Sequence, residues 1–287
     1  MSRGRAVDGG LIGLARWGIE AALALFQGQR SRRRPLFRQA SRMLDAFEAH
    51  NVAPHQLPRL MPTALRLKPQ EVTSSAVLAS HLLVDHLDWA SDFLALRREW
   101  LDLEGEQPHR EVHTYKDPRT LHRWLEERQA ICGDRLGSVH VLTESAFADP
   151  GQAHGRFFVV YEEAFAELDD KSLSRYWYLS NGARFSHPPC VIGLLEILTI
   201  AEHFAVLPVG HVVSSKITRA AERGTLGLLP SALKDHRRWH PQDWVPVRYA
   251  TINCKTEAHR AYWEATRDSL IDAGLEASLS HRRSSSA

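Results

Sequence analysis

The spacing of apolar residues predicts that the N-terminal third of the chain is helical. Between residues 36 and 50 the apolar positions recur at steps of three and four, which places them on one face of an amphipathic helix. These positions are Leu36, Ala40, Met43, Leu44 and Phe47. Asn51 follows them and suits a helix end, because asparagine tolerates the left-handed backbone found there.

Four further short elements follow this helix. Residues 53–62 predict a second helix that starts at Pro54, and the prolines at positions 58 and 62 keep it short. Residues 65–69 lead into a third element, and Ser74 or Ser75 caps a helix from Ala76 to about His86. A helix from Asp88 and a turn at Trp100 complete five short helices.

From residue 118 to residue 212 the pattern alternates between helix and strand. It predicts a helix over 118–130, strands over 138–142, 155–161 and 172–179, a helix from Pro188, and a strand over 206–212. The run 157–161 is apolar without interruption, which indicates burial on both faces. Helices at about 214–223 and 257–273 follow. The expected fold class is therefore α+β, with an all-α bundle before an α/β domain that has a small mixed sheet in the order αβββαβ.

These patterns divide the chain into four parts. Residues 1–34 hold an amphipathic helix and a basic linker, 35–105 the helical bundle, 106–275 the α/β domain and 276–287 a disordered tail. Residues 104–117 are polar and predict a connector between the domains. The helix at 11–26 is interrupted by Arg16 and Glu20, so it is too short and too charged to cross a bilayer. It is expected to pack or dimerise, with binding at a membrane surface as the alternative.

The stretch from Asp88 to Leu101 carries the most specific pattern. An apolar helix face ends at a short break, and Trp100-Leu101 begins one more turn. It resembles the last two helices of a lambda-repressor-like (XRE/Cro type) helix-turn-helix domain, over roughly residues 36–105. The resemblance implies double-stranded DNA as a partner and a homodimer on paired half-sites. The glycine-containing turn before the recognition helix is missing, and prolines occupy that place.

Positive and negative charges are nearly balanced over the whole chain, but arginines form a basic cluster over residues 30–42. The chain has 36 Lys and Arg against 34 Asp and Glu, for a formal net charge of +2. The basic cluster favours contact with phosphates, and a solvated linker is the alternative. Together with candidates in the short helices, it gives the predicted DNA-binding set Arg30, Arg32, Arg33, Arg34, Arg38, Arg42, His55, Gln56, Arg59, Lys68 and Gln70. Of these, His55, Gln56 and Gln70 are candidates for base edges.

The three cysteines argue against a disulfide framework or a zinc ribbon. Cys132, Cys190 and Cys254 are odd in number, far apart and without a CxxC pair. A reducing cytoplasm is the expected location.

The order of elements from 118 to 212 is similar to the αβββαβ core of PD-(D/E)xK metal-dependent nucleases. That chemistry needs an Asp and an acid-x-Lys on adjoining strands, to hold divalent ions. Here the strand at 156–161 carries no acid, and Asp169-Asp170-Lys171 lies in a turn. The sequence therefore lacks the expected metal ligands in that arrangement.

Other catalytic and cofactor motifs are missing from the sequence. The chain has 16 histidines, but His81/Asp85 and His236/His240 are only pairs, whereas a zinc site needs three or four ligands. The motifs GxSxG, GxGxxG and GxxxxGK[ST] do not occur. We therefore expect no metal and no cofactor.

The densest mixture of aromatic and basic residues lies between 175 and 187. On a strand, Arg175, Trp177 and Leu179 share one face, and Tyr176 and Tyr178 share the other. One interpretation is core packing and a turn. The other is a ligand pocket, in which an aromatic ring stacks on the ligand and basic groups anchor an anion. The predicted ligand-binding residues are Arg175, Trp177, Arg184 and His187.

The function expected from the sequence is that of a bacterial-style, DNA-binding transcription regulator. Its C-terminal domain is expected to sense a small-molecule effector or to mediate dimerisation. One alternative is an enzyme, nuclease-like or other, with its site in the α/β domain. Another is a non-catalytic interaction protein.

Overall fold

The computed structural model describes residues 35–133, 137–234, 236–246 and 254–280. They form two compact units, which are described separately. The helical unit comprises 35–48 and 52–87, and the α/β unit comprises 49–51 and 88–280. The division falls within a helix, earlier in the chain than residue 105. The predicted helix at 11–26, the arginines at positions 30, 32, 33 and 34 and most of the expected tail lie outside the described residues.

The helical unit begins with α2 (Pro35–Ala49), as the apolar spacing predicts. Ala40, Met43 and Phe47 are buried, whereas Leu36 is 52% exposed and so does not belong to the buried face. Asn51 has a φ of 63° just after the helix, so the predicted helix end is confirmed.

The next elements are single turns. They are η1 (Pro54–Gln56), α3 (Leu57–Leu60), η2 (Thr63–Leu65), η3 (Pro69–Val72) and α4 (Ser75–Leu78). Proline lies at the first or second position of η1, α3 and η3, where its missing N–H costs nothing, and the prolines keep these turns short.

The single helix expected over 76–86 is wrong. Ser74 caps α4, where its hydroxyl accepts a hydrogen bond from the N–H of Val77 at 3.4 Å. A new helix, α5 (Val84–Phe93), starts because Nδ1 of His86 accepts the N–H of Leu83 at 3.1 Å. Nε2 of the same ring contacts the carbonyl of Leu65 at 3.1 Å, which holds the cap in place. The predicted turn at Trp100 is present as α6 (Arg98–Leu101).

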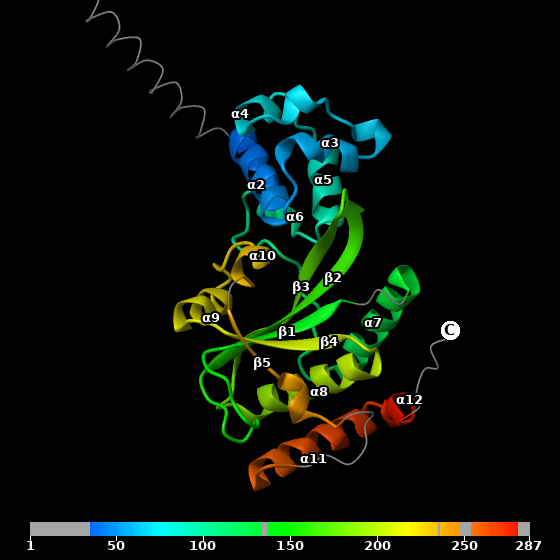
Figure 1. Ribbon diagram of the computed structural model, residues 1–287, viewed down its shortest axis with the longest axis vertical. Coiled ribbons are helices and arrows are strands. Elements are labelled where there is room, and N and C mark those ends of the chain that lie inside the picture. Colours follow the sequence, from blue (N-terminus) through cyan, green and yellow to red (C-terminus); the bar gives the residue numbers. More distant parts are fainter. Residues whose placement is uncertain (1–34, 134–136, 235, 247–253, 281–287) are drawn as a thin grey trace, which may run out of the picture. The chain divides into compact units, whose positions relative to one another are not determined.

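The α/β unit is built on a five-stranded mixed sheet in the order β3-β2-β1-β4-β5 (Figure 1). The strands are β1 (Ser138–Thr143), β2 (Arg156–Leu168), β3 (Lys171–Arg184), β4 (Leu207–Val212) and β5 (Arg237–Trp239). β4 runs parallel to β1, and the other neighbouring pairs are antiparallel. The prediction of a mixed α+β protein with a small mixed sheet is confirmed.

Helices cover both faces of this sheet (Figure 1). One face carries α7 (Pro118–Cys132), α8 (Pro188–His203), η4 (Pro241–Trp244), α11 (Glu257–Asp272) and α12 (Glu276–Ser280). The other carries α9 (Ser215–Glu222) and α10 (Leu229–Ala232). Trp177 and Leu179 belong to the core of the first face, and Tyr176 and Tyr178 to that of the second, so the predicted alternation along β3 is confirmed.

Within the segment expected as a connector, residues 110–114 lie along the outer edge of β3. The N–H of Val112 donates to the carbonyl of Tyr178 at 2.8 Å, and the N–H of Tyr178 donates to the carbonyl of Arg110 at 3.0 Å. His109 in this segment is fully buried. This segment therefore protects the edge of the sheet, as well as joining α6 to α7.

Candidate functional site

A cluster of polar side chains lies on the face of the sheet that α9 and α10 cover. Its members come from four adjacent strands: His140 on β1, Glu162 on β2, Tyr176 on β3 and His211 on β4. Tyr176 faces the same core as the neighbouring apolar residues of that side. Pairing of β1 with both β2 and β4 brings side chains from distant parts of the chain together.

The cluster is largely withdrawn from solvent. His211 is 0% exposed and His140 is 5% exposed, whereas the side chain of Glu162 is 29% exposed. Buried imidazoles are costly unless their nitrogens find partners. The cluster thus extends from the partly exposed carboxylate of Glu162 to a fully buried histidine.

A chain of short hydrogen bonds connects the four residues. Nε2 of His140 lies 2.7 Å from Oε2 of Glu162, and the hydroxyl of Tyr176 donates to Oε1 of the same carboxylate at 3.0 Å. Nδ1 of His140 lies 2.8 Å from Nε2 of His211. His140 therefore bridges the carboxylate and the second imidazole.

Two pKa shifts define the charges in this cluster. Burial alone would raise the pKa of Glu162, but hydrogen bonds from His140, Ser174 and Tyr176 outweigh it and lower the pKa to about 2. Burial, together with electrostatic interactions with His140, Arg238 and His236, lowers the pKa of His211 to about 3. At neutral pH the carboxylate is ionised and His211 is uncharged.

These charges fix the hydrogen positions. An ionised carboxylate only accepts hydrogen bonds, so Nε2 of His140 carries its hydrogen toward Glu162. When His140 is neutral, its Nδ1 accepts from Nε2–H of His211. The remaining nitrogen, Nδ1 of His211, is then a bare lone pair. This atom is buried and has no hydrogen-bond partner among the described residues.

The predicted ligand residues Arg175 and Trp177 lie on the opposite face of the sheet. Nε of Arg175 donates to the fully buried carboxylate of Glu163 at 2.5 Å. The ring of Trp177 packs against those of Trp124 and Tyr161, at centroid distances of 5.4 and 5.9 Å. Trp177 thus packs in the core and Arg175 pairs with a buried carboxylate, as expected from the interpretation of this run as core packing.

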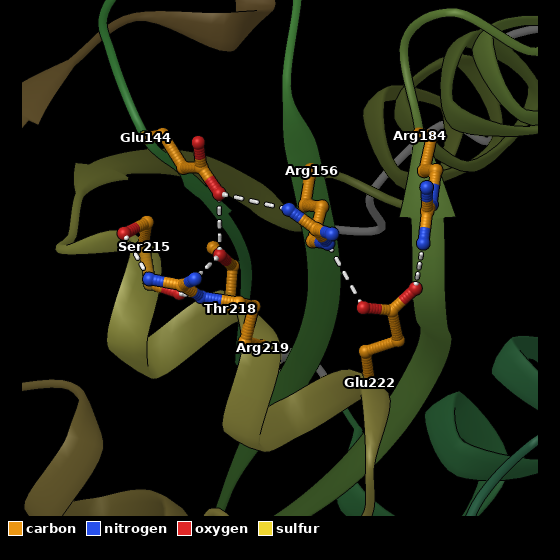
Figure 2. A network of polar contacts seen from close by, with 7 residues as sticks. All are labelled: Glu144, Arg156, Arg184, Ser215, Thr218, Arg219 and Glu222. Atoms are coloured by element: carbon orange, nitrogen blue, oxygen red, sulfur yellow. Dashed lines mark hydrogen bonds and ion pairs between the residues drawn. The ribbon is translucent and has the colours of Figure 1, made fainter.

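Arg184 and His187 have partners of their own. Arg184 donates to Oε1 of Glu222 at 2.5 Å, and Nε of Arg156 donates to Oε2 of the same carboxylate at 2.8 Å (Figure 2). Nε2 of His187 lies 3.2 Å from the hydroxyl of Tyr115. The structure thus places Arg175 and Trp177 on the same face of the sheet. Arg184 and His187 each contact a different residue.

The described DNA-binding candidates are spread over several turns of the helical unit. They lie on α2 (Arg38, Arg42), η1 (His55, Gln56), α3 (Arg59) and the start of η3 (Lys68, Gln70). Oε1 of Gln56 accepts the N–H of Ala53 at 3.0 Å, so this amide caps its own turn. A recognition helix presents its base-contacting side chains from one continuous helix. Among residues 53–83 the structure describes only helical segments of three or four residues.

Within the described ranges, no group of three or more His, Cys, Asp or Glu side chains is arranged to hold a metal ion. In the same ranges, no helix combines the length and the apolar character needed to cross a membrane.

The sequence reasoning did not single out His140, Glu162 or His211. The available signal was a histidine at a buried position on each of two strands, β1 and β4. Comparisons with protein-family models, with curated proteins and with solved structures find no match for this chain.

Proposed function

We propose that the α/β unit is an enzyme that performs general acid–base chemistry at His211. The observation that carries the proposal is the unbroken hydrogen-bond chain from Glu162 through His140 to His211, which ends at a buried nitrogen without a partner. Nδ1 of His211 is one of several buried side-chain atoms without a hydrogen-bond partner among the described residues, and what distinguishes it is its position at the end of this hydrogen-bond chain, where a ligand or a water would complete it. Imidazole is also the commonest general base in proteins.

The chain provides a balanced path for one proton. A substrate group X–H at Nδ1 of His211 loses its proton to that nitrogen, and the electron pair of the X–H bond stays on X. His211 passes its Nε2 proton to Nδ1 of His140 across 2.8 Å. His140 then carries two protons and a positive charge, which lies beside the carboxylate of Glu162 at 2.7 Å.

This relay explains how a buried histidine with a low pKa can still act as a base. A positive charge on His211 itself is disfavoured by burial, as its pKa of about 3 indicates. Transfer of the second proton moves the charge to His140, where an ionised carboxylate stabilises it. When the two transfers are concerted, His211 carries no net charge at any stage, and the same steps in reverse return the proton to the product.

The proposal is tested by turnover of small molecules. The purified full chain is incubated with a metabolite extract, and the compounds consumed are identified by mass spectrometry. We expect His211→Gln to reduce turnover roughly a hundredfold or more, because loss of a general base has effects of that order. Glu162→Gln is expected to reduce it less, since it removes only the charge that stabilises His140.

The control is His113→Gln, which replaces an exposed histidine. It is expected to keep the wild-type rate, while circular dichroism checks that all variants are folded. Failure of the wild type to consume any compound, or equal turnover by the His211 variant, would contradict the proposal.

We propose DNA binding by the helical unit as a second function, which is compatible with the first. Five of its seven described candidates are exposed, namely Arg38, His55, Arg59, Lys68 and Gln70. Exposed cations neutralise phosphates and release counterions, so the affinity for duplex DNA is expected to fall steeply with salt. Replacing Arg32, Arg33 and Arg34 with Gln is expected to weaken binding and to flatten that salt dependence. Binding that is insensitive to salt would argue against this function.

A further inference from the structure

Strand β5 places a cation next to the terminal histidine of the relay. In the antiparallel pairing of β4 with β5, Arg238 lies directly opposite His211. Residues that face each other across an antiparallel pair project from the same side of the sheet. Trp239 lies opposite Gly210 and belongs to the core of the other face. Arg238 and His211 therefore share the α9–α10 side.

His236 lies at the same end of the cluster as Arg238. It precedes β5, two residues before Arg238, and its ring centroid lies 6.3 Å from that of His211 at an interplanar angle of 87°. Its Nε2 contacts the carbonyl of Ala232 at 2.9 Å. A guanidinium and a second imidazole thus lie on the side of His211 that belongs to β5.

The free nitrogen of His211 is on the side of the ring away from the relay. Nε2 is directed toward His140 on β1, and the two nitrogens of an imidazole ring point in widely different directions. β1 and β5 flank β4 on opposite sides. The bare Nδ1 is therefore not the atom that faces β1.

Arg238 is an exposed guanidinium that is available to a ligand. Among the described residues, none of the ion pairs or side-chain hydrogen bonds involves it. The carboxylate of the relay itself, that of Glu162, is already occupied by His140 and Tyr176. A guanidinium presents paired N–H groups that match the oxygens of carboxylates and phosphates.

We infer that the molecule bound at His211 is a small oxyanion, whose carboxylate or phosphate group Arg238 holds beside Nδ1 of His211. This inference rests on the proposed acid–base function and specifies its substrate class. The ring of His236 lies on the same side, with its centroid 6.3 Å from that of His211. In this arrangement Arg238 binds the anionic group, and the relay takes a proton from the same molecule.

The test uses the full chain labelled with ¹⁵N at histidine, with the ring nitrogens observed by NMR. Sodium phosphate and sodium acetate are titrated separately at constant ionic strength, maintained with chloride. We expect at least one of the two to shift the His211 resonances in a saturable manner, and the stronger of the two identifies the preferred oxyanion. Arg238→Gln is expected to weaken that binding roughly tenfold or more, as loss of one charge-assisted hydrogen bond does.

Arg237→Gln is the matched control. Arg237 is the exposed neighbour of Arg238 on the same strand, but it lies opposite Val212 and so projects from the other side of the sheet. This variant is expected to keep the wild-type affinity. The inference is overturned if neither anion shifts His211, if Arg238→Gln binds like the wild type, or if both arginine variants lose binding equally. In each of these cases the acid–base function still stands or falls on the turnover lost in His211→Gln.

Discussion

Two neighbouring carboxylates on β2 show how environment separates a candidate site from a structural ion pair. Glu163 is fully buried between Arg175 at 2.5 Å and Arg128 at 3.7 Å, and the thiol of Cys132 donates to it at 3.3 Å. Two permanent cations compensate this buried charge, and truncating both would leave it unpaired. Glu162 instead meets groups that exchange protons, and its hydrogen-bond chain ends at an open nitrogen.

At the residue scale, the geometry around Arg238 and His211 depends on one glycine. A Cβ at Gly210 would come within 2.4 to 2.5 Å of ring carbons of Trp239, closer than such atoms approach. We expect Gly210→Ala to destabilise the protein by about 1–3 kcal/mol, because the indole must move from a packed core. Chemical denaturation measures the change.

Gly193→Ala is the control for this substitution. Gly193 lies within α8, and the nearest atom to an added Cβ would be 3.9 Å away. Alanine is the better helix former, so this variant is expected to be stabilised by about 0.5–1 kcal/mol. A loss of stability in both variants would show that the close approach of Trp239 is not the cause.

At the element scale, polar contacts at the strand ends hold α9 against the sheet. Glu222 at its C-terminal end binds Arg156 on β2 and Arg184 on β3. Earlier in the helix, the hydroxyl of Thr218 donates to Glu144 at 2.7 Å (Figure 2). Because α9 covers the face that carries the relay, these contacts control how firmly that face is closed.

We expect Glu222→Gln to loosen α9 without unfolding the protein. Partly exposed ion pairs contribute up to about 1 kcal/mol, so amide exchange in α9 is expected to accelerate several-fold while exchange in α11 stays unchanged. Hydrogen exchange read by mass spectrometry measures both helices. Glu276→Gln, which removes the exposed pair with Arg267, is the control and is expected to leave α9 protected. Faster exchange throughout the chain would point to a global effect instead.

The sequence predicted the strands more successfully than the site. Alternation and continuous apolar runs located β1 to β4, because each depends on local pattern. The separation of α4 from α5 was not predictable in this way, since it depends on the ring of His86 reaching Leu65. The contact of His140 with His211 depends on parallel pairing of β1 with β4, about seventy residues apart, which no local pattern encodes.

At the scale of the whole molecule, the buried cluster makes stability depend on pH. The pKa of His211 falls from 6.5 to about 3 on folding. Below pH 6.5 this imidazole therefore binds a proton in the unfolded chain but not in the native state. Burial also lowers the pKa of the fully buried His109 and acts in the same direction. The pKa of Glu162 falls from 4.5 to about 2, so its contribution is present above pH 4.5 and is lost as the pH falls toward 2. All three shifts make the free energy of unfolding decrease with acidification.

His211→Gln isolates one part of this dependence. Without that imidazole, the loss of stability between pH 6.5 and 4.5 is expected to become shallower by on the order of 1 kcal/mol per pH unit, the value for one proton. Urea denaturation at several pH values across this window measures the slope, and His113→Gln, which alters an exposed ring, is expected to keep the wild-type slope. A His211 variant with an unchanged slope would mean that this ring is protonated in the native state. The assignment of Nδ1 of His211 as an unprotonated nitrogen would then be wrong, and so would the proposed direction of proton transfer toward His140.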